Sequence, residues 1–332
     1  MCYRLKERLG SGSYSEVFCV RNVHTNKEFA AKFSPANDTD SILQHEYEVL
    51  SKLQGIAGIP RITAFGKEAS YSVMVFEHLG PSLEKVFHSC HRSFSHHTIA
   101  EIGEQLVCSI RCLQNIHLHS YIHRDVKPSN ILIGTGQDAP TVYLVDFGIA
   151  KPYRDPHTHL HNTFGKCGSF LGSPAFASIN GHLRLKVGRQ DDLESLSYLL
   201  IYLACGSLPW LGHTPCLEND TIISMKRDIF QCGDIPEVLL TLLSYSRSLP
   251  FLQKPDYVYL QALMKSLCTD PLCDSWPEWL HSDGTLSMSI IMNDSPAWGC
   301  KREKPVVGKR PTTGYLSMYL LCTFASRLTI CY

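Results

Sequence analysis

The chain has 332 residues, 44% of them apolar, which is enough to bury the core of one large domain or of two lobes. Lys and Arg together number 31 and Asp and Glu also number 31, so no net charge favours binding to nucleic acid or to a membrane. The 14 cysteines include no Cys-x-x-Cys pair and follow no secretory leader, so we expect free thiols in a reducing compartment. We therefore expect a globular, monomeric protein of the cytoplasm that could also enter the nucleus.

The first 80 residues predict a small, β-rich lobe. Short apolar runs in residues 3–33, interrupted by turn residues at 10–13 and 22–27, indicate three antiparallel strands. Two further strands fit residues 62–65 and 72–76. Between them, four apolar residues share one face of a predicted helix: Ile42, Val49, Leu50 and Leu53.

After residues 80–81, Gly-Pro, the pattern becomes mainly helical. Two sets of apolar residues recur at helical spacing: Ile99, Ile102, Leu106, Ile110 and Leu113, and then Leu193, Leu196, Leu199, Leu200 and Leu203. Residues 142–145 form a short apolar run that predicts a buried strand ending at Asp146. We expect an α+β chain with an N-lobe at 1–79, a C-lobe at 80–285 and a divergent tail at 286–332. The apolar end of that tail, residues 315–332, is too interrupted to span a membrane and predicts a packed or frayed segment.

The strongest functional motif is His-Arg-Asp-Val-Lys-Pro-Ser-Asn at residues 123–130, followed by an Asp-Phe-Gly that begins at Asp146. At this spacing the two motifs match the catalytic loop and the metal-binding motif of protein kinases. Asp125 is predicted to accept or orient the proton of a substrate hydroxyl, and Asn130 and Asp146 offer the oxygen ligands that Mg²⁺ prefers. The sequence therefore predicts an ATP- and Mg²⁺-dependent phosphotransferase.

Two further residues favour serine and threonine as phosphate acceptors. Lys127 stands two residues after the predicted base, where a cation can reach the γ-phosphate, as in serine/threonine kinases. Ser173, within Gly-Ser-Pro at 172–174, occupies the position of a hydroxyl that such kinases hold against the catalytic aspartate and lysine.

A glycine-rich turn and a lysine are predicted to hold the phosphates. Gly10 and Gly12 lie between two strand patterns, although Ser15 replaces the third glycine, and this turn alone would as readily be an ordinary hairpin. Lys32 follows Phe-Ala-Ala and would bind the α- and β-phosphates, with a helix carboxylate as its partner. Glu46 and Glu48 compete for that role, and they point about 200° apart around the helix.

Several stretches resemble the casein kinase I family in particular. The resemblance rests on Gly-Pro-Ser-Leu-Glu at 80–84, Ser-Ile-Asn at 178–180 in place of Ala-Pro-Glu, Arg-Gln-Asp-Asp-Leu-Glu-Ser at 189–195 and Gly-Ser-Leu-Pro-Trp at 206–210. It covers about residues 3–267 and implies the bilobal kinase fold, with a small antiparallel sheet and one helix in the N-lobe. The family register selects Glu46 as the partner of Lys32, and it gives Asp192 the task of tying a helix to the catalytic loop.

The resemblance also implies an ATP pocket. Adenine would lie between Val17 and Ala30 above and Leu132 below, and would bind backbone groups at Glu77 and Leu79. The residues implied around ATP and its metal are Leu9, Gly10, Gly12, Val17, Ala30, Lys32, Phe76, Glu77, Leu79, Asn130, Leu132 and Asp146.

The substrate side departs from the family. Its members favour serine or threonine downstream of an acidic or phosphorylated residue and hold that residue in a basic pocket. Ala175 and Thr214 stand where the pocket arginine and lysine are expected, and Gly165 and Gly168 replace further basic residues, which leaves Lys166 alone. We expect a weak preference for such primed substrates. Family members are generally active without phosphorylation of the activation segment, so we also expect constitutive activity.

The sequence also admits three other interpretations: a pseudokinase, a small-molecule phosphotransferase and a zinc-binding protein. A pseudokinase that only binds nucleotide or protein is the main alternative, suggested by Ser15, the altered basic pocket and the divergent tail. A small-molecule phosphotransferase fits less well, because residues 172–180 match the segment that positions peptides in protein kinases and because the chain has Gly-Pro-Ser-Leu-Glu at 80–84. A zinc site at His157, His159 and His161, or at Cys90 with its neighbouring histidines, lacks paired ligand spacing, and Cys108 and Cys112 are more simply core residues.

Overall fold

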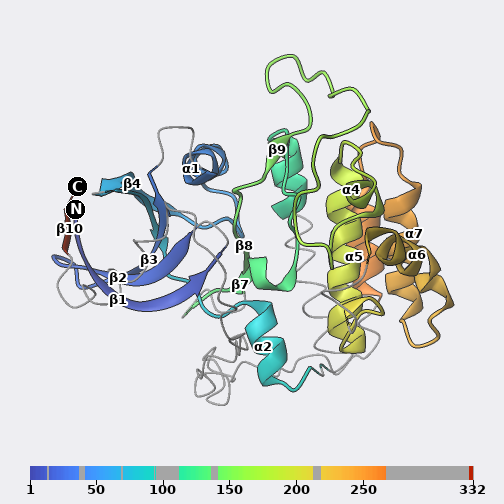
Figure 1. Cartoon of the computed structure of the whole chain (residues 1–332), viewed down its shortest axis with the longest axis horizontal. Coiled ribbons are helices and arrows are strands. Elements are labelled where there is room, and N and C mark those ends of the chain that lie inside the picture. Colours follow the sequence, from blue (N-terminus) through green and yellow to red (C-terminus); the bar gives the residue numbers. More distant parts are fainter. Residues whose placement is uncertain are drawn as a thin grey trace, which may run out of the picture.

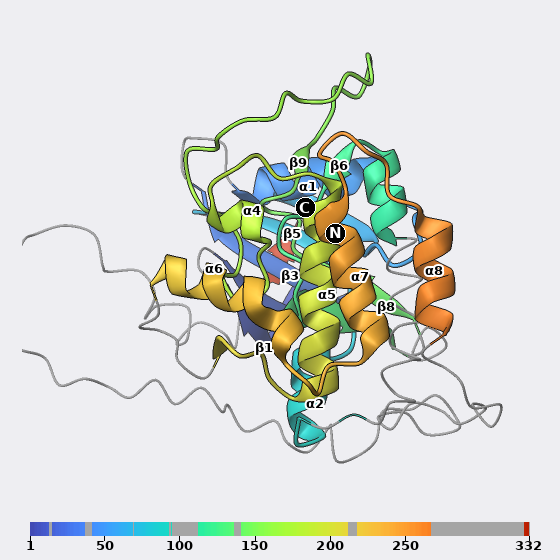
Figure 2. The ribbon, with the colours of Figure 1, turned by 90° about the vertical axis from the view of Figure 1, so that its right-hand side faces the viewer.

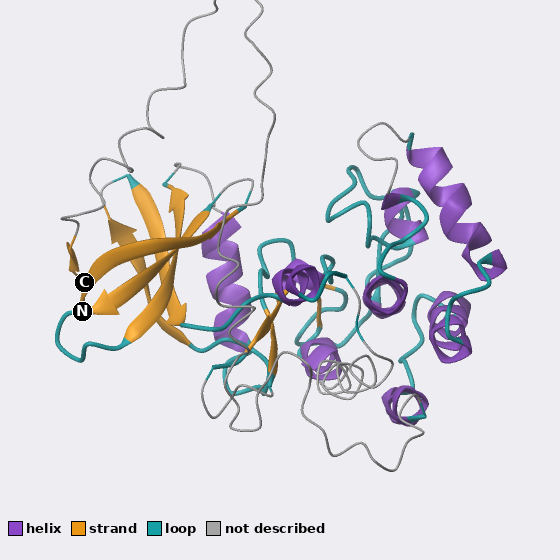
Figure 3. Ribbon diagram, turned by 90° about the horizontal axis from the view of Figure 1, so that it is seen from below, coloured by secondary structure: helices purple, strands orange, loops and turns teal. Residues whose placement is uncertain are grey.

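The computed structural model describes residues 1–12, 15–36, 42–68, 70–92, 94, 112–135, 141–211, 218–266 and 329–331. A β-sheet with one helix forms one end of the molecule, and a group of helices forms the other (Figure 1). Figure 3 shows the same division by colour, with the large sheet at one end and most helices at the other. This is the α+β, two-lobed arrangement that the sequence predicted.

The N-lobe is built on an antiparallel sheet. Its strands are β1 (Cys2–Ser11), β2 (Glu16–Asn22), β3 (Glu28–Pro35), β4 (Ile62–Glu68) and β5 (Tyr71–Glu77), and β10 (Thr329–Cys331) adds to the edge, in the order β10-β1-β2-β3-β5-β4. Alternate residues of these strands bury one face around Tyr3, Val20, Ala31, Val73 and Val75. All five strands predicted in this lobe are confirmed, and β10 is the part of the tail that is described, lying where the two chain ends meet (Figure 1).

Helix α1 (Ile42–Lys52) packs against the sheet and confirms the predicted helix. Val49, Leu50 and Leu53 are buried as expected. The prediction for Ile42 was wrong, because its side chain is 44% exposed. It begins the helix beside Gly148, and the buried position at this end of the helix is taken by the next residue, Leu43.

The C-lobe is organised around α5 (Arg189–Cys205), which lies among the other helices in Figure 2. Leu193, Leu196, Leu199, Leu200 and Leu203 are fully buried, and nearly every other residue of α5 is buried as well. A helix that is covered on all sides acts as the core of its lobe. The helices α2 (Leu83–Ser89), α4 (Ile179–His182), α6 (Asn219–Asp228), α7 (Glu237–Ser248) and α8 (Tyr257–Lys265) complete the lobe together with the 3₁₀ turn Ile229–Gln231.

Two small two-stranded sheets flank the loops that contain the sequence motifs. Strand β6 (Tyr121–Ile122) pairs with β9 (Lys151–Pro152), and β7 (Ile131–Ile133) pairs with β8 (Val142–Leu144). The chain from β6 to β7 contains residues 123–130 and the 3₁₀ turn Pro128–Asn130, and Asp146 follows β8 directly. The strand predicted at 142–145 is confirmed. The pairing of β6 with β9 and of β7 with β8 brings the two sequence motifs side by side.

Some expectations lie outside the described residues. These include Ile99, Ile102, Leu106, Ile110 and Cys108, and the tail at 286–332 apart from β10. Cys112 and Leu113 are described and are buried core residues, as expected. Within the described part of the chain, no helix combines the length and apolar character needed to cross a bilayer.

Candidate active site

Lys32 stands at the centre of the N-lobe side of the site. It lies on β3, where its backbone is paired with Val17 on one side and Met74 on the other. Its Nζ donates to Glu46 Oε2 at 2.7 Å and to Asp146 Oδ1 at 2.9 Å. Three elements that are distant in sequence therefore meet at one ammonium group.

Helix α1 resolves the choice between its two carboxylates. Glu46 is 3% exposed and points inward to Lys32, whereas Glu48 is exposed and accepts a hydrogen bond from Gln44 on the same helix. Because residues two apart on a helix lie about 200° apart, only one of them can face the sheet.

The electrostatics favour the charged forms of Lys32 and Asp146, whereas burial raises the pKa of Glu46 against the opposing charge of Lys32. Burial by itself would lower the pKa of Lys32, but the carboxylates of Glu46 and Asp146 outweigh burial and raise it. Burial likewise opposes ionisation of Asp146, and the Lys32 ammonium overcomes it and lowers the pKa of that carboxyl. Asp146 is therefore ionised and available as an oxygen ligand at neutral pH.

The catalytic loop gathers a second cluster around Asp125. Lys127 Nζ lies 2.7 Å from Asp125 Oδ2 and donates to Ser173 Oγ at 2.9 Å. The backbone N–H of Ser173 donates to Asp125 Oδ1 at 3.0 Å, and Asn130 Nδ2 donates to Asp125 Oδ2 at 3.1 Å and to its backbone oxygen at 2.9 Å. The structure thus brings together Asp125, Lys127, Asn130 and Ser173, which sequence reasoning selected separately.

Asp192 on α5 binds the backbone of this loop. Its carboxylate accepts hydrogen bonds from the backbone N–H groups of His123 and Arg124, each at 2.8 Å, and lies 3.0 Å from His117 Nε2. Arg124 has φ of 74°, an unusual conformation that these bonds help to hold. His117 was missed by sequence reasoning, since a single histidine on an apolar helix face carries no signal of its own.

Gly172 allows the activation segment to reach the catalytic loop. Its φ is +97°, and a Cβ atom there would lie 2.7 Å from the backbone oxygen of Arg124. Only glycine tolerates both the conformation and the close approach. Ser173 can therefore sit directly against Asp125.

The residues expected around adenine come from neighbouring strands of the N-lobe and from β7 in the other lobe. Ala30 and Phe76 are neighbours across β3 and β5, and Val17 is the neighbour of Lys32 across β2 and β3. Leu132 lies on the hairpin of the other lobe, joined to this region by the hydrogen bond from Gly80 N to Ile133 O at 2.8 Å.

The remaining predicted nucleotide contacts are placed on the same lobe. Leu9 and Gly10 end β1, and the backbone N–H of Gly12 donates to Ser15 O at 2.8 Å, which closes the turn. Glu77 ends β5 with its side chain bonded to Arg61 N, and Leu79 follows it as a buried residue.

The side-chain oxygens of Asn130 and Asp146 are suitable ligands for Mg²⁺. The amide nitrogen of Asn130 is used by Asp125, which leaves its oxygen as the atom able to bind a metal. The Asp146 side chain is 44% exposed even though one of its oxygens contacts Lys32. A hard cation prefers such oxygen ligands.

A cavity of about 310 Å³ lies beside this site rather than in it. It is lined by the activation segment, α5 and the two-stranded sheet of β6 and β9, with Arg124, Lys151, Cys167 and Lys186 among its polar residues. None of the residues expected around ATP lines it. Sequence reasoning did not predict this cavity.

The comparison with protein families agrees with this geometry. Residues 3–271 match the family model described as the protein kinase domain. Such domains transfer phosphate from ATP to proteins and generally use a divalent metal. Since the match covers most of the 332 residues and contains both clusters described above, the chain belongs to the protein kinase family.

Proposed function

We propose that this protein is an ATP- and Mg²⁺-dependent serine/threonine protein kinase similar to the casein kinase I family. The observation that carries the proposal is the closed cluster of Asp125, Lys127 and Ser173, in which each residue contacts the other two. A carboxylate, an ammonium group and the activation segment thus meet at one point, together with Asn130, one of the two residues proposed to bind the metal.

The two clusters divide the work of phosphoryl transfer. Asp125 would receive or orient the proton of the acceptor hydroxyl, and Lys127 would stabilise charge that develops on the transferred phosphate. Lys32 would hold the inner phosphates, with Glu46 keeping its ammonium group in place. Asn130 and Asp146 would hold Mg²⁺, which when bound neutralises charge on the phosphates. Catalysis would depend mainly on positioning and electrostatics.

Serine and threonine are favoured as acceptors by the Lys127–Ser173 contact. The hydrogen bond of 2.9 Å ties the lysine of the catalytic loop to the activation segment. A short hydroxyl side chain of the substrate would have to approach Asp125 beside this contact. Phosphoamino-acid analysis of labelled casein tests it, and phosphotyrosine as the main product would contradict it.

A weak preference for primed substrates also forms part of the proposal. Ala175 offers only a methyl group where the family has a basic residue, and its backbone oxygen accepts from Trp210 Nε1 at 2.8 Å. Thr214 lies outside the described residues. Peptide pairs with and without phosphoserine three residues before the acceptor should differ little in kcat/KM, and a strong preference for the primed peptide would refute this part.

Activity without an upstream kinase is supported by the same contacts. Lys32 is paired with Glu46 and Ser173 lies against Asp125 through contacts that involve no phosphorylated side chain. Protein made in a bacterial host without such kinases should therefore be active as isolated.

The decisive experiment measures transfer of labelled phosphate from ATP to casein by wild type, Asp125→Asn and Asp146→Asn in Mg²⁺. We expect only the wild type to transfer phosphate, since loss of a general base typically lowers the rate by about 10² to 10⁴. Asp220→Asn, an exposed substitution on α6, is the matched control and should be fully active. If wild type binds ATP but transfers none, the protein is a pseudokinase and the proposal fails.

A further inference from the structure

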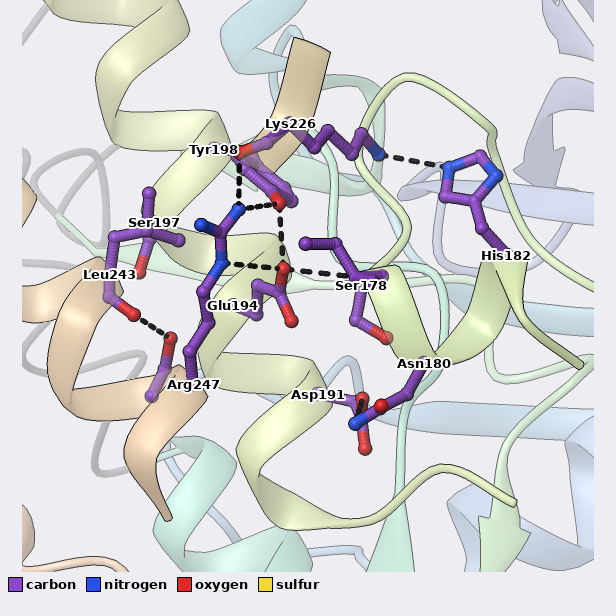
Figure 4. A network of polar contacts seen from close by, with 12 residues as sticks. Ser178, Asn180, His182, Asp191, Glu194, Ser197, Tyr198, Lys226, Leu243 and Arg247 are labelled. Carbon is purple, nitrogen blue, oxygen red and sulfur yellow. Dashed lines mark hydrogen bonds and ion pairs between the residues drawn. The ribbon is translucent and has the colours of Figure 1, made fainter. Parts of the chain in front are cut away.

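Lys226 is a fully buried lysine that the catalytic clusters do not use. It lies on α6 with no exposed surface, and its Nζ is 2.8 Å from Pro174 O, 2.5 Å from Ala177 O and 3.0 Å from His182 Nε2 (Figure 4 shows the contact with His182). An ammonium group has three protons. Each of them therefore has one acceptor.

His182 on α4 can accept from Lys226 as the tautomer that carries its proton on Nδ1. Nδ1 lies 2.6 Å from Asn219 Oδ1, an oxygen that can only accept, and a proton there leaves the Nε2 lone pair for Lys226. Nε2 also lies 3.0 Å from Pro174 O, the carbonyl oxygen that accepts from Lys226. Asn219 Nδ2 in turn donates to His182 O at 3.2 Å. Burial, and then the charge of Lys226, lower the pKa of His182, which keeps the ring neutral.

Aromatic rings complete the surroundings of the ammonium group. Lys226 Nζ lies 4.7 Å from the ring centre of Tyr198 and 5.2 Å from that of Trp210. Trp210 also donates from Nε1 to Ala175 O at 2.8 Å. Side chains of the C-lobe therefore donate hydrogen bonds to three carbonyl groups of one short segment, those of Pro174, Ala175 and Ala177.

A neighbouring ion pair anchors the end of the same segment. Glu194 Oε1 accepts from Arg247 Nε at 3.1 Å, from Tyr198 OH at 2.6 Å and from the backbone N–H of Ile179 at 3.3 Å (Figure 4). Burial lowers the pKa of Lys226 to about 7, and the charge of Glu194 opposes that shift. The lysine is therefore kept at an electrostatic cost, which an apolar side chain of the same length would avoid.

The segment held in this way is the one that faces the acceptor. We define residues 172–178 as the acceptor segment, because Ser173 within it contacts both Asp125 and Lys127. We propose that Lys226, supported by His182, is a positioning residue that fixes the acceptor segment in the conformation that receives a protein substrate. This inference rests on the proposed kinase function for its choice of substrate.

The geometry predicts a selective effect on the protein substrate. Within the described part of the chain, Lys226 bonds to Pro174, Ala177 and His182 and not to Lys32, Glu46 or Asp146, which hold the ATP side of the site. Loss of its three donors should loosen the acceptor segment and leave ATP binding intact. A lysine that only stabilised the fold would instead affect both substrates alike.

The test compares Lys226→Met, which keeps the length of the side chain without its donors, with Arg227→Met, an exposed change at the next residue of α6. The measurements are kcat and KM for a serine peptide, KM for ATP, and hydrogen exchange of the amides at 172–178. We expect Lys226→Met to raise the peptide KM about tenfold and to speed exchange in the acceptor segment, with the ATP KM unchanged. Equal changes in both KM values, or unchanged exchange, would overturn the proposal.

A second pair of variants covers the case in which Lys226→Met does not fold. His182→Leu removes one acceptor from Lys226, and His182→Gln restores an oxygen that can accept. We expect the leucine variant to raise the peptide KM and the glutamine variant to recover most of the loss; equal behaviour of the two would count against the role of His182. If wild type transfers no phosphate, the kinase proposal fails, and the exchange measurement still decides whether Lys226 fixes the acceptor segment.

Discussion

Replacing Glu46 with glutamine would test the electrostatic centre of the N-lobe. The change keeps the size of the side chain and an oxygen that can accept from Lys32, and it removes only the charge. At 2.7 Å and an effective dielectric constant of about 20, the lost attraction is about 6 kcal/mol. Most of it is offset because the buried carboxylate no longer has to be desolvated, and Asp146 still faces Lys32 at 2.9 Å. We therefore expect only about 1–2 kcal/mol of lost stability.

The larger effect should appear in catalysis. Without Glu46, Lys32 would be drawn toward Asp146 and away from the phosphates, so that kcat/KM for ATP should fall about 30- to 100-fold, or roughly 2–3 kcal/mol. Steady-state kinetics with ATP varied at saturating peptide measures this, and urea unfolding measures stability. Glu48→Gln, on the exposed face of the same helix, is the control and should match wild type. An equal loss in both variants, or no loss in Glu46→Gln, would refute the reasoning.

Three further substitutions test how the C-lobe supports the site. Burial raises the pKa of Asp191 to about 7, although Ser178 and the backbone N–H of Gly188 oppose the shift. The folded protein then binds one more proton than the unfolded chain between about pH 4 and 7, so wild type should lose stability relative to Asp191→Asn by about 1.4 kcal/mol per pH unit as the pH rises through that window. Urea unfolding at several pH values measures this, and parallel profiles would contradict it. Gly172→Ala places a Cβ 2.7 Å from Arg124 O and should cost about 2 kcal/mol or more with a sharp fall in kcat for peptide; normal kinetics would argue against the close approach. Trp210→Phe removes the bond to Ala175 O from a fully buried site and should lower the unfolding free energy by about 2–3 kcal/mol. Wild-type stability in that variant would show that the contact is unimportant.

The sequence predicted the elements and the chemistry of the site because both follow from local patterns. Alternating apolar residues determine the strands of the N-lobe, and helical spacing of leucines predicts α5. The fixed order of residues in 123–130 and at Asp146 indicates phosphoryl transfer. Ile42 was misplaced by the same method, because Ile42 and Leu43 are both apolar and spacing alone did not show that Leu43 takes the buried position.

Tertiary structure alone decided which residues act on one another. The contacts of Lys32 with Asp146 and of Lys127 with Ser173 join segments 114 and 46 residues apart, and no local pattern records such pairings. Lys226 is the clearest case. In the sequence it stands beside Arg227 near the end of a polar helix and is indistinguishable from a surface lysine, yet packing of α6 against α5 and the acceptor segment buries it completely. Burial raises the free-energy cost of losing any hydrogen bond of a charged group, because no water is present to replace the lost partner.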